Sequence, residues 1–581
     1  MSEPNAHPFP ALSIADAYRL LTAPGAPFET EDCEIFNRHV RVYRHGYKNL
    51  RAILEGSLRW PEREYLVFEG ERLTYDAHYR AVAALTRVLI ARYGITKGDR
   101  IAIAMRNFPE WPIAFWSAAA CGAIVTPLNA WGMSEDLQYG IVNAGAKVVI
   151  ADAERLDRLA PVRDDLGGAA LIAVRAPALT FADALTDLIG PPERYGSIAD
   201  CRLPDIRIDP EDDVTIFYTS GTTGRPKGAL GTHRNITTNI MNIDFAAAFA
   251  ALRRGDHVPV NDPGAPQKTA LLAAPFFHVT GCHSNLVPAM AKGRKLVLMY
   301  KWSAERALEL IERERINTTG GVPAMAWQLL ESPEFSRHDL SSLEGVSYGG
   351  AAAVPELTLK VGRMLPEVTP RQAYGATETS SVSTTNSGED FVRKPDSVGL
   401  PAAVCDVRIV RGDGSIAESG ERGEIWIAGP NVVKGYWRNA EATAAAFVDG
   451  WYRTGDIGAV DAEGFVYVLD RIKDMLIRGG ENIYCVEIEG AIFAHEAVLD
   501  AAVIGIPDRV LGEEVACVVQ RKPGTDFSEE ALRDHLRSRL SAHKVPKYVE
   551  IRDEELPKNA SGKTLKRELR EALGRRLSAN T

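Results

Sequence analysis

Short runs rich in valine and isoleucine alternate with alanine-rich stretches over much of this chain. Three of these runs, at residues 101–104, 148–150 and 214–217, lie within residues 73–260 and are separated by sequence of helical character. Strands that alternate with helices in this way are typical of parallel sheets covered by helices. The alternation therefore predicts an α/β fold for this part of the chain.

The pattern occurs a second time and then changes. Apolar runs at residues 296–299 and 345–348 lie on either side of a helical segment at 304–315, which predicts a second α/β layer in the same body. From residue 396 onward, short strands are punctuated by glycine, as in a small β-rich subdomain. After residue 471 helices and strands are mixed, which predicts a compact α+β unit.

The length of the chain requires more than one domain. A single hydrophobic core stops growing at roughly 250 to 300 residues, and this chain has 581. We expect an α/β protein with a large N-terminal domain over residues 1–472. That domain combines two α/β layers with the β-rich subdomain. A small, mobile α+β C-terminal domain follows over residues 473–581.

Charge argues against nucleic acid as a partner. The net charge is −10, and acidic and basic residues are interspersed, so the surface repels a phosphate backbone more than it attracts one. The basic stretch at residues 558–576 is the local exception. A solvated helix face beside a small anionic ligand is the favoured interpretation of that stretch, and a nucleic-acid tail is the alternative.

One uncharged stretch, at residues 111–134, is long enough to cross a bilayer. Pro112, Gly122 and Pro127 divide it into an alanine-rich helix and a short strand, which is typical of a buried βαβ unit. We therefore expect no integral membrane segment.

The cysteines and the N-terminus indicate a reducing compartment. The seven cysteines are scattered and never form C-x-x-C, which argues against a disulfide framework or a zinc site. The N-terminal segment lacks a signal pattern because Glu3 and Asp16 interrupt it. A cytoplasmic protein is expected, and a homodimer is left open.

Residues 218–228, which read YTSGTTGRPKG, form a candidate phosphate loop directly after a buried strand. Glycines let the backbone approach an anion, hydroxyls donate hydrogen bonds, and a lysine supplies a cation. The spacing differs from the Walker pattern, which disfavours a simple P-loop ATPase. The candidate nucleotide-binding residues here are Thr219, Ser220, Gly221, Thr222, Thr223, Gly224 and Lys227.

Seven motifs then follow one another along nearly the whole chain. They are YTSGTTGRPKG at 218–228, PFFHVTG at 275–281, YGGA at 348–351, YGATET at 374–379, YRTGD at 452–456, DRIKDMLIRGGENI at 470–483 and PKNASGK at 557–563. In this order they resemble the adenylate-forming superfamily of acyl-CoA synthetases, adenylation domains and luciferases.

The resemblance implies roles for particular residues. Glu378 is a carboxylate suited to holding Mg²⁺, and Lys563 is the cation expected to stabilise the adenylation transition state. Thr222, as a hydroxyl donor, and His278, at a position resembling the gate of the acyl pocket, complete the candidate catalytic residues. His278 is given no acid–base role.

The same resemblance implies a nucleotide site. Asp456 is expected to accept hydrogen bonds from the ribose hydroxyls, and Arg471 to assist there. Thr377 is expected at the α-phosphate. The remaining candidates are Tyr374 and Gly375 in the YGATET motif, and Gly350 and Ala351 at the adenine slot.

A hinge is implied at Lys473, two residues after Arg471. Turning about it would bring in the segment at 478–482, where Gly479 and Gly480 leave room for the pantetheine arm of coenzyme A. Asp470 replaces a glycine that is frequent in the family, a difference shared with luciferase-like members.

These features predict an AMP-forming acyl-CoA ligase that uses ATP, Mg²⁺ and coenzyme A. The segments at 276–283 and 347–353 are apolar and small, which favours an uncharged hydrophobic acyl group over a diacid or an amino acid, with fatty, aryl and alicyclic acids all open. The nearest alternative is a stand-alone adenylation enzyme that loads a carrier protein. A silent nucleotide-binding protein and a luciferase are less favoured, because Glu378, Asp456 and Lys563 are all present and nothing indicates luciferin oxidation.

Overall fold

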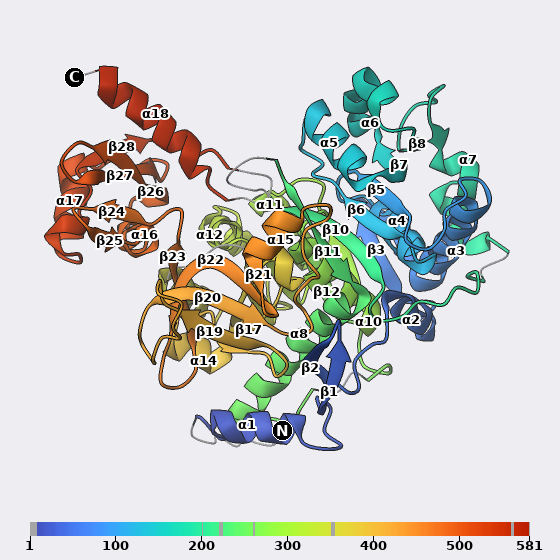
Figure 1. Cartoon of the computed structure of the whole chain (residues 1–581), viewed down its shortest axis with the longest axis horizontal. Helices are drawn as coiled ribbons and strands as arrows, with labels where there is room; N and C mark the ends of the chain where they lie inside the picture. The colour runs from blue at the N-terminus through green and yellow to red at the C-terminus, as the bar shows by residue number, and fades with distance from the viewer. Residues whose placement is uncertain are drawn as a thin grey trace.

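The computed structural model describes residues 9–199, 202–219, 225–259, 262–349, 355–558 and 563–579. Its strands form five sheets. In Figure 1, two large sheets with their helices form the body of the molecule, a β-rich unit lies beside them, and a C-terminal unit stands at one end. This arrangement confirms the predicted α/β class with a large N-terminal and a small C-terminal part.

The first large sheet has the strand order β11-β10-β6-β5-β7-β8-β9. Its strands are parallel except for β11, which runs antiparallel to β10. The strands are β5 (Arg100–Ala104), β6 (Ile124–Pro127), β7 (Ala146–Asp152), β8 (Ala170–Val174), β9 (Asp183–Ala184), β10 (Asp213–Thr219) and β11 (Lys227–Thr232).

The second large sheet has the strand order β18-β17-β16-β15-β14-β12-β13-β3-β4. An early hairpin joins it, because β3 pairs in parallel with β13, a partnership that the sequence pattern does not predict. The strands are β3 (Glu64–Phe68), β4 (Glu71–Thr74), β12 (Thr269–Leu272), β13 (Lys295–Leu298), β14 (Thr318–Gly321), β15 (Gly345–Tyr348), β16 (Thr369–Tyr374), β17 (Thr384–Ser387) and β18 (Leu400–Pro401).

Helices between the two sheets form the largest core. Trp111 and Phe115 of α4 (Glu110–Ala120) are fully buried, and Trp111 stacks on Phe276 with ring centroids 4.9 Å apart. Each such side chain contributes roughly 1.5–3 kcal/mol on burial. The uncharged stretch at 111–134 is therefore a buried helix followed by β6. Within the described residues, the structure contains no helix that combines the length and the apolar character needed to span a bilayer.

The other helices cover the outer faces of the sheets. Helices α5 and α6 pack on the first sheet, and α11, α12 and α13 pack on the second. The helices of the body include α2 (Leu50–Gly56), α3 (Tyr75–Ala91), α5 (Ser134–Ala144), α6 (Ala153–Leu159), α7 (Leu185–Ile189), α8 (His233–Arg254), α10 (Val287–Lys292), α11 (Ala304–Glu314), α12 (Pro323–Glu331), α13 (Pro355–Met364) and α14 (Gly388–Arg393).

Two smaller units complete the chain. The β-rich unit is a five-stranded sheet of β19 (Asp406–Val410), β20 (Gly423–Ala428), β21 (Phe447–Val448), β22 (Trp451–Val460) and β23 (Val466–Arg471), with α15 (Ala440–Ala446) beside it. The C-terminal unit contains β24 (Leu476–Arg478), β25 (Glu481–Ile483), β26 (Val498–Asp508), β27 (Gly512–Arg521), β28 (Tyr548–Arg552), α16 (Cys485–Phe493), α17 (Glu529–Arg537) and α18 (Lys566–Ala579).

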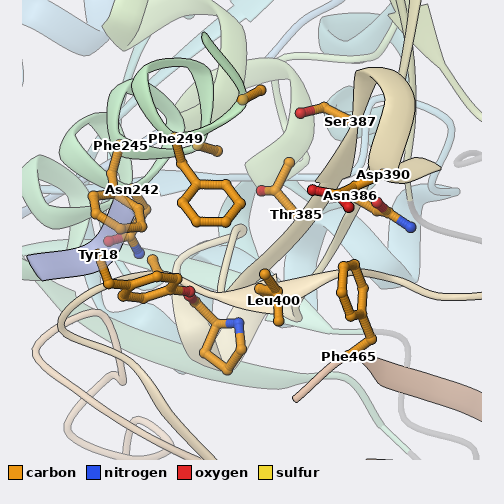
Figure 2. A pocket seen from close by; sticks show the side chains of 14 residues that line it. Tyr18, Asn242, Phe245, Phe249, Thr385, Asn386, Ser387, Asp390, Leu400 and Phe465 are labelled. Atoms are coloured by element: carbon orange, nitrogen blue, oxygen red, sulfur yellow. The ribbon is translucent and has the colours of Figure 1, made fainter. Parts of the chain in front are cut away.

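The N-terminal helix α1 (Ile14–Thr22) packs on the end of α8. Figure 2 shows Tyr18 beside Phe245 and Phe249, where a small pocket remains between α1, α8 and β17. The Tyr18 ring centroid lies 5.1 Å from that of Phe245, and its hydroxyl donates a hydrogen bond to the Pro401 carbonyl. The N-terminal segment thus ties α8 to the strand that precedes the β-rich unit.

Candidate active site

The phosphate-loop candidate joins β10 to β11, so it leaves the first sheet at the end of a buried strand. Ser220, Gly221, Thr222, Thr223 and Gly224 lie outside the described residues. On either side of them, Thr219 and Lys227 are cross-strand partners, and the Thr219 hydroxyl donates a 3.3 Å hydrogen bond to the Lys227 carbonyl. The two ends of the loop are therefore held together.

Lys227, Tyr436 and Glu378 form a chain of contacts beside this loop. The Lys227 ammonium lies 5.1 Å from the centre of the Tyr436 ring, and the Tyr436 hydroxyl donates a 2.7 Å hydrogen bond to Glu378 Oε1. A cation over an aromatic face is stabilised by the ring quadrupole. The contacts bring a cation from the phosphate-loop segment close to the predicted metal-binding carboxylate.

The backbone after β16 positions Glu378. The 3₁₀ turn Thr377–Thr379 carries both Thr377 and Glu378, and Glu378 is only 7% exposed. Gly375 is required in front of this turn, because a Cβ there would lie 1.5 Å from the Ser381 carbonyl oxygen. The Glu378 carbonyl also accepts a 2.9 Å hydrogen bond from the Val433 amide, which holds the Tyr436 segment alongside.

A second carboxylate lies on the β-rich unit. The Tyr374 hydroxyl donates a 2.7 Å hydrogen bond to Asp456 Oδ2, and Arg471 Nε lies 3.2 Å from Asp456 Oδ1. Asp456 and Arg471 are cross-strand partners on β22 and β23. Burial raises the pKa of Tyr374, so the phenol stays a donor, and Asp456 raises the pKa of Arg471. Tyr374 and Arg471 thus each hold one oxygen of the Asp456 carboxylate.

Lys563 belongs to the C-terminal unit, just before α18, and it faces the same site. Its charge interacts with those of Arg471, Asp456 and Glu378, and desolvation, together with Arg471, lowers its pKa to about 8. Burial, with a further effect of Lys563, lowers the pKa of His278 to about 4, so this imidazole is neutral near pH 7. His278 Nε2 is buried without a hydrogen-bond partner among the residues that the structure describes.

The remaining sequence-predicted residues lie in the connection from β23 to the C-terminal unit, in the turn between β24 and β25, or outside the described chain. Lys473 connects β23 to β24, and Gly479 and Gly480 form the turn between β24 and β25 with φ of +60° and +87°. These positive angles are accessible to glycine at little cost. Gly350 and Ala351 lie outside the described residues.

Asp470 joins β23 to the C-terminal unit. Its carboxylate accepts hydrogen bonds from the amides of Arg471 and Cys485, at 2.7 and 2.5 Å. Cys485 is the first residue of α16, where backbone amides lack helical partners and a carboxylate is favoured. Burial raises the pKa of Asp470 to about 6. Asp470 thus makes a contact between β23 and α16.

Tyr436 is a site residue that the sequence motifs do not identify. The available signal is the aromatic pair Tyr436-Trp437 directly after Lys434-Gly435, in a segment otherwise poor in aromatic residues. A single tyrosine is more often a packing residue, and only the contact with Glu378 distinguishes it. The site therefore gains a hydroxyl donor that holds the predicted metal ligand.

Comparison with known proteins gives matches over most of the chain. The profile of the AMP-binding enzyme family matches residues 55–437, and that of the AMP-binding enzyme C-terminal domain matches residues 487–563. A feruloyl-CoA synthase of Amycolatopsis sp is 36% identical over 506 residues, covering 87% of this chain and 95% of that protein.

Two further matches agree with these. A long-chain-fatty-acid–CoA ligase of Bacillus subtilis (strain 168) is 33% identical over 565 residues, covering 90% of this chain and 94% of that protein. Among solved structures, ATP-bound MatB from Rhodopseudomonas palustris has a TM-score of 0.78 at 29% identity, covering 90% of this chain and 99% of that chain.

Proposed function

Since this chain belongs to the AMP-binding enzyme family and is an AMP-forming acid–CoA ligase, we propose that its substrate is a hydrophobic carboxylic acid, such as a fatty acid. Relatives named for feruloyl-CoA and for long-chain fatty acids support an apolar acyl body. The aromatic side chain of Phe277, beside His278, fits such a body.

The proposed reaction has two steps. In the first, a carboxylate oxygen of the acid attacks the α-phosphorus of ATP, the bond to the oxygen that bridges to the β-phosphate breaks, and pyrophosphate leaves. In the second, the thiolate of coenzyme A attacks the acyl carbonyl carbon, AMP leaves, and the proton of the thiol passes to solvent. Positioning and charge stabilisation carry the first step, so no covalent enzyme nucleophile is needed.

One observation carries the adenylation proposal: the Lys563 cation faces Glu378 and Asp456 from another unit of the chain. In the proposed mechanism, Asp456 accepts the ribose hydroxyls, with Arg471 and Tyr374 orienting it. Lys563 stabilises negative charge that shifts between the carboxylate and the α-phosphate. Lys227 supplies a cation at the polyphosphate.

The residues present fit a magnesium ion. Mg²⁺ is usually held by one or two carboxylates together with substrate phosphates, and Glu378 is a buried carboxylate oriented by Tyr436. Within the described residues, no cluster of three or more histidine, cysteine, aspartate or glutamate side chains gathers at one point. We propose that Glu378 holds the ion jointly with ATP oxygens, where it neutralises their charge.

We further propose that the two steps use two orientations of the C-terminal unit. The boundary is placed between residues 472 and 473, so that Lys473 is the hinge and residues 473–581 turn as a body. The charge interaction of Lys563 with Glu378 and Asp456 supports assigning the present orientation to adenylation. Turning would withdraw Lys563 and bring the Gly479-Gly480 turn towards the site for thioester formation.

The test is acid-dependent release of AMP from ATP, with and without coenzyme A, across straight-chain, aryl and alicyclic acids of graded size. We expect turnover that requires coenzyme A and that favours apolar acids. Adenylation indifferent to coenzyme A would favour loading of a carrier protein instead. No AMP release with any acid would overturn the proposed activity.

A further inference from the structure

The turn that carries Glu378 continues into two serines with unusual backbone angles. Ser380 and Ser381 have φ of +52° and +97°, in a region that residues other than glycine rarely adopt. Such strain persists only where surrounding contacts hold the backbone in place, and it is concentrated at functional sites. The contacts made by this turn therefore help to fix the position of Glu378.

One side chain of α8 holds the end of the turn and also holds the segment that follows His278. Asn239 is fully buried. Its Oδ1 accepts a 2.9 Å hydrogen bond from the Val382 amide, and its Nδ2 donates a 2.8 Å hydrogen bond to the His283 carbonyl. Asn242, three residues further along α8, donates a 2.9 Å hydrogen bond to the Val382 carbonyl. The Asn239 amide thus ties Val382 to His283.

Two further contacts run from this segment to the nucleotide side of the site. Ser284 Oγ lies 2.7 Å from Ser381 Oγ, so the two hydroxyls form a hydrogen bond. The His283 ring packs edge-on against Phe217, with ring centroids 4.8 Å apart. Phe217 lies near the end of β10, which leads into the phosphate-loop candidate. The segment therefore contacts both the turn after Glu378 and the strand before the phosphate loop.

The segment is part of one helical stretch that begins at His278. The His278 carbonyl accepts a 2.9 Å hydrogen bond from the Cys282 amide. A π-helical turn follows over Cys282–Leu286, and such turns are frequent at functional sites. Because His283 and Ser284 belong to the same stretch, fixing the position of His278 also fixes theirs.

We propose that this helical stretch couples binding of the acid to binding of Mg²⁺–ATP, with Asn239 and Ser284 as positioning residues. The inference rests on the proposed function, in which the acid lies beside Phe277 and His278. An acid held there fixes the helical stretch. Asn239 and Ser284 then keep the strained turn in the conformation that presents Glu378. Each substrate therefore raises the affinity for the other by the same factor.

The test measures the affinity of the full-length enzyme for the acid by titration calorimetry, with and without a nucleotide that cannot react. The acid is the one that gives the fastest AMP release in the series above. The nucleotide is Mg²⁺ with an ATP analogue in which a methylene group replaces the oxygen between the α- and β-phosphates. In the wild type the nucleotide should raise the affinity for the acid by roughly 5- to 150-fold. A ratio of one would overturn the inference.

Ser284→Ala and Ser381→Ala each remove one side of the hydroxyl contact. Each should lower this ratio by roughly two- to tenfold, the effect of one hydrogen bond. The double variant should lower it no further than either single one, because both remove the same contact. Asn239→Leu, which loses both of its hydrogen bonds, should lower it more. The matched control is Ser342→Ala, since the buried Ser342 hydroxyl donates to the Ile316 carbonyl, away from the site, and the ratio should stay unchanged.

Ser380→Gly separates coupling from a merely structural role. The Ser380 hydroxyl is buried and has no hydrogen-bond partner among the residues that the structure describes. Glycine adopts positive φ at little cost, so the substitution removes strain from the turn. The variant should therefore bind the Mg²⁺–analogue complex more tightly in the absence of acid, and the ratio should fall. Weaker binding of the complex would contradict the role of the strained turn.

Failure of the coupling and failure of the ligase activity give different results. An unchanged ratio in Ser284→Ala and Ser381→Ala, with normal AMP release, would overturn the coupling and leave the ligase activity standing. AMP release with no acid at all would remove the proposed function itself. Thermal unfolding confirms that each variant is folded. The two alanine variants, which each remove a single oxygen, carry the test if Asn239→Leu does not fold.

Discussion

Lys522 Nζ lies 2.9 Å from Glu331 Oε1, and this ion pair joins the C-terminal unit to the end of α12. Lys360 Nζ approaches the same oxygen at 2.6 Å. In the proposed mechanism the C-terminal unit turns between the two steps, so the Lys522 contact is made only in the orientation with Lys563 at the site. The pair should therefore stabilise the adenylating orientation.

Lys522→Met should slow adenylation by roughly two- to fivefold, because a partly exposed ion pair contributes about 0.2–1 kcal/mol. The reaction of supplied acyl-adenylate with coenzyme A should be unchanged or faster. Single-turnover rates of the two half-reactions measure this. Lys544→Met is the matched control, since Lys544 pairs with Glu487 within the C-terminal unit. An equal loss in both half-reactions would contradict the assignment.

Lys563→Ala should abolish adenylation, with a loss of at least about 100-fold, because it removes a cation that stabilises the transition state. Supplied acyl-adenylate should still react with coenzyme A. The measurement is pyrophosphate release for the first step and thioester formation for the second. If both steps fall together, Lys563 does not serve adenylation alone.

The pH dependence of adenylation should report Lys563. Its pKa is lowered to about 8, and only the protonated ammonium can stabilise negative charge, so kcat/KM for ATP should fall as the pH rises through about 8. Bound phosphates favour the charged form, so kcat at saturating ATP should fall at a higher pH. In Lys563→Arg the guanidinium stays charged, and whatever activity remains should not decline at about pH 8. A wild-type profile that stays level there would exclude this role.

Tyr436→Phe should weaken the binding of Mg²⁺ during the reaction. The substitution removes the hydroxyl that orients Glu378, and loss of such a supporting contact typically costs 10- to 100-fold in metal affinity or activity. The Mg²⁺ concentration for half-maximal rate should rise accordingly. Tyr467→Phe, which removes a hydroxyl bonded to Asp461 elsewhere on the β-rich unit, should have no such effect. If the Mg²⁺ concentration for half-maximal rate were the same in Tyr436→Phe as in the wild type, Tyr436 would have no role in orienting Glu378.

Lys473→Pro should spare adenylation and impair thioester formation, because proline fixes φ at the proposed hinge. Lys473→Ala, which leaves φ free, should spare both steps. The measurement is the rate of acyl-adenylate formation and the rate of thioester formation in each of the two variants. A normal second step in the proline variant would refute rotation about this residue.

Much of the fold follows from local sequence patterns. The apolar run at 101–104 corresponds to β5, because a strand buried on both faces must be apolar throughout. The run at 345–348 corresponds to β15, in which Ser347 is exposed. Ser528 caps α17 by accepting a hydrogen bond from the Ala531 amide, and serine before a first turn that contains acidic residues is a recognisable helix start. The pairing of β3 with β13 is not predictable in this way, because tertiary packing selects partners far apart in the chain.

The candidate site is predicted less completely than the fold. The motifs identify Glu378, Asp456 and Lys563, and the structure brings their charges within range of one another. The roles assigned to them remain predictions. Tyr436 carries no motif, since its significance depends on its contact with Glu378.

The hydrogen bond from Tyr18 to Pro401 joins residues 383 positions apart, and Tyr18 also packs on α8. During synthesis at about 5–20 residues per second, α1 leaves the ribosome roughly 20 to 80 seconds before this partner is made. Until then the surface of α8 and β18 on which the apolar face of α1 packs is incomplete. The first helix can pack on α8 earlier, but its contact with β18 is completed only after Pro401 has been made.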